Sequence, residues 1–83
     1  MSKKEKLLKR LKTIPIDFTY EELTTLLLAL GFEIHNMGKT SGSRIRFSKG
    51  ECCIILHKPH PRNEMRVYQL KQVLELLEKE KMI

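Results

Sequence analysis

The sequence of 83 residues has no tryptophan, three prolines, four glycines and two cysteines. No apolar run approaches the roughly 18 residues that a membrane-spanning helix needs. The start of the chain also lacks the continuous apolar stretch of a secretory signal. Cys52 and Cys53 are adjacent, so on a strand their side chains point to opposite faces and cannot pair. A disulfide framework is therefore excluded, and we expect a cytoplasmic protein without a membrane partner.

The sequence also lacks the spacing of a metal site. Zinc ligands from cysteine are usually separated by two to four residues, whereas Cys52 and Cys53 are neighbours. Residues 38–42 have the residue types of a phosphate-binding loop, but they precede a predicted strand rather than a helix. We therefore expect no metal and no other cofactor.

The charge of the chain is unevenly distributed. Lys and Arg outnumber Asp and Glu by 16 to 10, which gives a net charge of +6. Residues 1–13 and 35–66 are strongly basic, whereas residues 14–34 carry four acidic side chains and no basic one. Two basic blocks around an acidic one favour a polyanionic partner such as nucleic acid. The alternative is that the excess charge only keeps the surface solvated.

Apolar periodicity predicts three helices and three strands in the order α-α-β-β-β-α. Thr19 and Glu22 form a capping-box pattern at the start of the second helix, and Gly31 follows its end. We expect a tight turn at Lys49-Gly50 between the last two strands. The predicted helices are residues 3–13, about 20–30 and 66–81, and the predicted strands are residues 32–35, 44–47 and 52–56.

These elements predict a single α+β domain over residues 1–83. A three-stranded antiparallel sheet with the second and last helices on one face satisfies the layer rule. Residues 52–56 are apolar at every position, which is typical of a strand covered on both faces. We therefore expect either the N-terminal helix or another chain to cover the second face.

The histidines are the residues that could carry acid–base chemistry. His57 and His60 lie beside Lys58 and Arg62 in a proline-containing segment. Imidazole takes and gives a proton near neutral pH, and flanking cations bind phosphate. This equipment fits metal-free RNA cleavage, in which a base activates the ribose 2′-hydroxyl. An equally good interpretation is a rigid loop whose histidines bond only the backbone. We expect His35 to be an outward, solvated side chain.

The order of these pieces resembles the HicA family of bacterial toxins. A helix ending in Leu30-Gly31-Phe32 is followed by a glycine/serine loop, a basic strand, and a strand that ends at a Pro-x-Pro turn with histidine. The resemblance covers residues 19–81, and residues 1–14 would be an added basic helix. It implies a fold like that of double-stranded-RNA-binding domains, mRNA cleavage, and neutralisation by a HicB-type antitoxin.

One position departs from the family pattern. The Gly-Ser-His element that carries the family's catalytic histidine reads Gly42-Ser43-Arg44 here. A guanidinium stays protonated at neutral pH, so Arg44 cannot act as a base and is expected to bind phosphate. His60 lies where such toxins have a second histidine near a proline, and His57 is inferred from strand geometry. We predict His60 and His57 as acid–base residues, and RNA contacts from Lys39, Ser43, Arg44, Arg46, Lys58 and Arg62.

Two other functions stay open. A catalytically impaired HicA-like module would hold RNA or an antitoxin without cleaving, and the arginine at position 44 motivates that alternative. A pure interaction subunit would use its basic faces to dock the acidic surface of an antitoxin. A helix-turn-helix DNA reader fits less well, because Pro15 and the residues after it give no tight turn between the first two helices.

Overall fold

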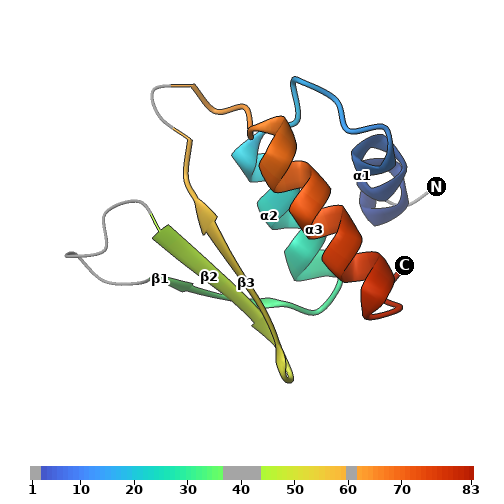
Figure 1. Cartoon of the computed structure of the whole chain (residues 1–83), viewed down its shortest axis with the longest axis vertical. Helices are drawn as coiled ribbons and strands as arrows, with labels where there is room; N and C mark the ends of the chain where they lie inside the picture. The colour runs from blue at the N-terminus through green and yellow to red at the C-terminus, as the bar shows by residue number, and fades with distance from the viewer. Residues whose placement is uncertain (1–2, 37–43, 60–61) are drawn as a thin grey trace.

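The computed structural model describes residues 3–36, 44–59 and 62–83 of the chain. The elements follow the predicted α-α-β-β-β-α order (Figure 1). The fold is therefore α+β, as the sequence predicts. The elements are α1 (Lys3–Lys12), α2 (Tyr20–Ala29), β1 (Glu33–Asn36), β2 (Arg44–Lys49), β3 (Cys52–His57) and α3 (Val67–Lys79).

The three strands form one antiparallel sheet in the order β1-β2-β3. Two residues, Gly50 and Glu51, connect β2 to β3, so the hairpin turn lies one residue later than predicted. Gly50 has φ +59°, a left-handed conformation that glycine adopts without steric cost. The first strand, β1, begins and ends one residue later than predicted. Phe32 lies in the connection between α2 and β1, where its side chain is buried, and does not pair with β2.

Helix α2 begins and ends with the signals that the sequence predicts. The Glu22 N–H donates to the Thr19 hydroxyl over 3.2 Å, and the Thr19 N–H donates to the Glu22 carboxylate over 3.0 Å. Gly31 follows the helix with φ +101°. The Lys49 ammonium from β2 donates to the Leu30 carbonyl over 2.6 Å, which neutralises the negative end of the helix. A capping box and a cationic partner thus fix both ends of α2.

The core lies between one face of the sheet and the two helices α2 and α3 (Figure 1). Side chains of β2 and β3 alternate between buried and exposed along each strand, as one covered face requires. Phe18 and Met65 are also buried, although both lie on connecting segments outside any periodic pattern. The buried apolar residues of the strands and of α2 and α3 are Ile45, Phe47, Ile54, Leu56, Leu23, Leu26, Leu27, Leu70, Val73 and Leu77.

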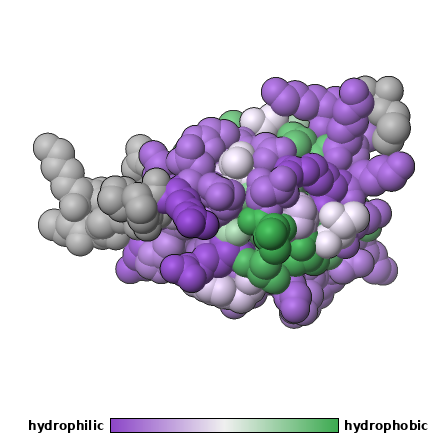
Figure 2. Space-filling view, turned by 90° about the horizontal axis from the view of Figure 1, so that it is seen from above, coloured by the Kyte–Doolittle hydropathy of each residue, from purple (hydrophilic) through white to green (hydrophobic). Residues whose placement is uncertain are grey.

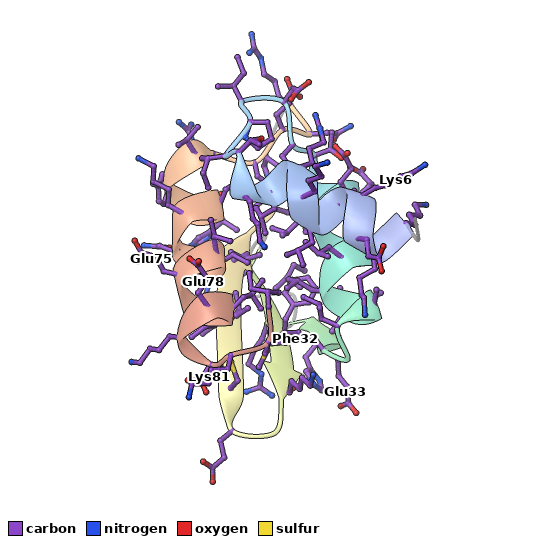
Figure 3. The ribbon with its side chains drawn as sticks, turned by 90° about the vertical axis from the view of Figure 1, so that its right-hand side faces the viewer. Lys6, Phe32, Glu33, Glu75, Glu78 and Lys81 are labelled. Carbon is purple, nitrogen blue, oxygen red and sulfur yellow. The ribbon has the colours of Figure 1, made fainter. Side chains whose placement is uncertain are left out.

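Helix α1 packs against α2 and α3 on the side away from the sheet (Figure 3). Its Leu7 and Leu11 are buried in the same core cluster. Of the two alternatives for the second face of the sheet, cover by this helix is therefore wrong, because its apolar side packs against the other helices. Consequently Cys53 and Ile55 of β3 are exposed on the uncovered face in this chain, Ile55 by 48%.

Candidate functional site

The uncovered face of the sheet gathers most of the chemistry of the strands. The register places Arg44 of β2 directly opposite His57 of β3. Arg46 lies opposite His35 on one side and opposite Ile55 on the other. Directly opposite residues of an antiparallel pair have Cβ atoms about 4.5–5.5 Å apart and share a face. We call the following set the outer sheet face: Glu33, His35, Arg44, Arg46, Ser48, Cys53, Ile55 and His57.

His35 contacts two neighbours on the outer sheet face. Its Nε2 lies 3.0 Å from the Ser48 hydroxyl, with which it forms a hydrogen bond. A carboxylate oxygen of Glu33 lies 3.7 Å from the same nitrogen. The residue points outward as predicted, and these neighbours give its ring nitrogen a local structural partner.

His57 is the exposed last residue of β3, and it belongs to two surfaces. On the outer sheet face it is the neighbour of Arg44. It also lines a depression of about 760 Å³ at the start of α3, together with Lys58, Arg62 and Arg66. We call this hollow the α3 depression. The structure thus brings predicted residues from β2, β3 and the following segment to one end of the sheet.

Three predicted site residues, Lys39, Ser43 and His60, lie outside the described residues. Of the described ones, Arg44 and Arg46 share the outer sheet face, whereas Lys58 and Arg62 line the α3 depression. His57 joins the two groups.

Backbone hydrogen bonds hold the segment before α3 against the segment before α2. The Tyr20 N–H donates to the Asn63 carbonyl over 2.8 Å, and the Met65 N–H donates to the Phe18 carbonyl over 2.7 Å. Met65 is only 2% exposed, so its side chain anchors the segment in the core. These contacts fix the positions of the chain on either side of Glu64, and thereby part of the lining of the α3 depression.

The cations around His57 differ from Arg10 of α1 in their partners. Arg10 forms 2.6 Å ion pairs with both Asp17 and Glu22, and its guanidinium lies 5.3 Å from the centre of the Phe18 ring. Within the described part of the chain, no carboxylate pairs with the cations around His57. The Lys58 ammonium lies 5.6 Å from the centre of the Tyr20 ring. Those unpaired cations are Arg44, Arg46, Lys58, Arg62 and Arg66.

Glu22 and Cys52 have clearly shifted pKa values. Burial acts to raise the pKa of Glu22, but hydrogen bonds from Thr19 and Arg10 and the charge of Arg10 together lower it. Burial raises the pKa of the Cys52 thiol, and Glu80 adds to that effect. Glu22 is thus a structural carboxylate, and Cys52 is disfavoured as a thiolate.

Metal sites and membrane spans are both absent from residues 3–36, 44–59 and 62–83. In these ranges no group of three or more His, Cys, Asp and Glu side chains is placed to hold a metal ion. None of the helices there has the length and apolar character to cross a membrane.

Arg66, Tyr68 and Gln69 line the α3 depression but were not predicted as site residues. The charge pattern places Arg66 in a basic block. Because the predicted helix already includes Arg66, the sequence does not show that this residue is the N-cap of α3. Gln69 is 5% exposed, but a single glutamine beside the apolar positions of a helix gives no distinctive signal in the sequence.

Fold and site together define a small basic α+β protein with an α-β-β-β-α core and one added N-terminal helix. The model of the family described as HicA toxin of bacterial toxin-antitoxin matches residues 20–78, more than half of the chain. The chain therefore belongs to the HicA toxin family, and it is the toxin of a toxin–antitoxin system whose partner is an antitoxin. Neither the curated proteins nor the solved structures gave a match.

Proposed function

We propose that this HicA-family toxin binds mRNA with the outer sheet face and the α3 depression, and cleaves it without a metal. The observation that carries the proposal is the place of His57 between two sets of cations. Arg44 and Arg46 lie on one side of it, and Lys58 and Arg62 lie on the other. Because these cations have no carboxylate partner among the described residues, phosphate need not displace an ion pair to reach them.

The chemistry requires one base and one acid. The base removes the proton of a ribose 2′-hydroxyl, and that oxygen attacks the adjacent phosphorus. The bond from phosphorus to the 5′-oxygen of the next nucleotide breaks, and the acid gives that oxygen a proton. We assign these roles to His57 and His60. Lys39, Ser43 and the arginines would hold the phosphates, and the cations nearest the phosphorus would stabilise its developing charge.

A purified-protein assay tests the assignment directly. The wild type should degrade an RNA transcript in the presence of EDTA, and His57→Ala/His60→Ala should reduce the rate about 100-fold or more. Expression of the wild type, but not of the double variant, should arrest growth. Wild-type cleavage rates in the double variant would show that the imidazoles do not carry the reaction.

The second candidate is a HicA-like module that binds RNA or an antitoxin without cleaving. The observation that favours it is Arg44, which stands opposite His57 where the family resemblance implies a histidine. Arg44→His would place a second imidazole directly across the strands from His57. Cleavage that appears only in this variant supports the binding module, whereas cleavage by the wild type excludes it.

An antitoxin of the HicB type would have to cover the site in order to neutralise it. Ile55 is 48% exposed in the middle of the outer sheet face, between the cations and the free edge of β3.

A purely protein-binding subunit is distinguishable from an RNA-binding toxin, because it would have no affinity for RNA at low ionic strength. RNA binding should instead weaken steeply with salt, since phosphate neutralisation releases counterions. We place this single-domain toxin in the cytoplasm, where its mRNA substrate is found.

A further inference from the structure

The lining of the α3 depression contains a largely buried glutamine whose amide the fold does not use. Gln69 lies in the first turn of α3, is only 5% exposed and lines the depression. Its backbone N–H donates to the Arg66 carbonyl, and no side-chain hydrogen bond of Gln69 joins it to another described residue. The amide atoms are accessible from the depression, because the Thr24 hydroxyl is the one fully buried side-chain group without a partner in the described part of the chain. The amide is therefore open to a partner from outside the chain.

The start of α3 offers donors beside this amide. Helix α3 has 13 residues, its cap residue Arg66 makes no side-chain cap bond, and its first turn has no acidic residue. The N–H groups of Val67 and Tyr68 have no acceptor in the described part of the chain. Free N–H groups and the helix dipole favour an anion at this end. Lys58, Arg62 and Arg66 add positive charge around the hollow, against the single carboxylate of Glu64.

The walls of the depression suit a flat ring as well as a phosphate. Tyr68 lines the hollow and is 56% exposed, and Ile16 from the segment between α1 and α2 is 82% exposed. Figure 2 looks down on this end of the molecule and shows an apolar patch within a largely hydrophilic surface. The volume of about 760 Å³ is in the range of small-molecule sites. Unpaired bases stack on tyrosine rings and arginine planes, and their edges are then open to hydrogen bonding.

We infer that the α3 depression holds one unpaired nucleotide of the bound RNA, and that the Gln69 amide selects its base. The inference rests on the proposed function and adds a specificity residue to it. The phosphate faces the start of α3 and the surrounding cations, the base stacks on Tyr68, and its Watson–Crick edge meets the Gln69 amide. Because His57 lines the same hollow, the selected base lies next to the proposed reaction centre.

Binding of four labelled RNA decamers tests the inference: A10, C10, U10 and (GA)5, each at low ionic strength. The wild type should prefer one base by about 5-fold or more, the discrimination expected of a good two-point base contact. Gln69→Leu should remove that preference and leave the unfolding temperature unchanged or higher. Gln69→Glu should raise the affinity for (GA)5 relative to A10, because a carboxylate only accepts and guanine presents two adjacent donors.

Controls separate base selection from changes in folding and in overall charge. Gln72→Leu removes the same side chain from an exposed position of the same helix outside the depression, and should leave the preference intact. Tyr68→Ala should weaken binding of all four decamers, whereas Tyr68→Phe should not.

The outcomes distinguish the two proposals. No binding of any decamer by the wild type would overturn the proposed function. Binding without base preference, or a preference that survives Gln69→Leu, would overturn the role of Gln69 while RNA binding stands.

Discussion

The two helices that cover the sheet begin in opposite ways, although they begin side by side (Figure 1). At α2 the Thr19 and Glu22 side chains satisfy the first N–H groups, and Glu21 adds a further negative charge. At α3 the cap residue is Arg66, which makes no such bond, and the first turn has no acidic side chain. One helix start is closed by the chain itself, and the other is left open to an external anion.

The cations of the two regions follow the same division. Arg10 is held by two carboxylates and ties α1 to the start of α2. Arg62 and Arg66 lie in the α3 depression without a carboxylate partner in the described part of the chain. The comparison teaches that similar residues serve structure in one region and remain available for binding in the other.

Removing the cations of the open region should have the largest effect. We expect Lys58→Gln/Arg62→Gln/Arg66→Gln to lower RNA affinity about 10- to 100-fold, because a neutral side chain no longer displaces counterions from the phosphate it faces. The slope of log affinity against log salt should fall by about 2 when three cations are removed. Titrations at several salt concentrations measure both quantities. Arg10→Gln is the matched control and should keep the wild-type affinity; equal effects in both variants would end the distinction between the regions.

Removing the cap side chain at the start of α2 should lower the unfolding free energy without changing RNA affinity. Thr19→Ala removes the hydroxyl that accepts from Glu22, and such a change at a helix cap costs about 1 kcal/mol. The unfolding temperature of a domain this small should fall by about 4–8 °C. Calorimetry measures it, with Thr25→Ala in the middle of the same helix as a control for loss of a hydroxyl. An unchanged unfolding temperature would show that the capping box is dispensable.

Adding a cap side chain at the start of α3 should raise the unfolding free energy and lower RNA affinity. Arg66→Asp supplies a cap side chain to α3, and we expect a gain of about 0.5–1 kcal/mol in unfolding free energy. RNA affinity should fall, because the added carboxylate occupies the donors and repels phosphate. Urea unfolding and RNA titration of the same sample measure the two changes. Arg66→Ala should lose affinity without gaining stability. If Arg66→Asp binds RNA as well as wild type does, the free helix start is not part of the site.

The smallest expected effect concerns pH. The folded chain lowers the pKa of Glu22, so the unfolded state binds more protons there as the solution becomes acidic. The stabilisation is therefore present above the ordinary glutamate value of 4.5 and is lost as pH falls through the lowered folded value. Urea midpoints at neutral and acidic pH should show a smaller acid-induced loss in Glu22→Gln than in wild type. An identical loss in both would remove Glu22 from this role.

The fold could be predicted wherever a local rule decides the structure. The Thr19–Glu22 capping box, the glycine after α2 and the alternation in β2 each depend on a few neighbouring residues, and each is confirmed. Phe18 and Met65 could not be predicted as core, because connecting segments have no periodicity to reveal which side chains turn inward. The packing of α1 could not be predicted either, because its apolar side could cover the second face of the sheet or pack on α2 and α3.

The site was predictable only in part for a similar reason. Arg44, Arg46 and His57 share a face because strands alternate, so their proximity follows once the pairing of β2 and β3 is known. Gln69 approaches the segment after β3 only through the tertiary fold, which the helical pattern of its own segment does not contain. Its burial in the lining of the α3 depression became visible only in three dimensions.

The central claim is that RNA binds at the open region around His57 and not along the lysines of α1. Chemical-shift mapping of the labelled protein with a U10 RNA tests it most directly. We expect the largest shifts at His57, Lys58 and the first residues of α3, with smaller ones at Arg44 and Arg46. Shifts confined to α1, with the start of α3 unchanged, would contradict the account.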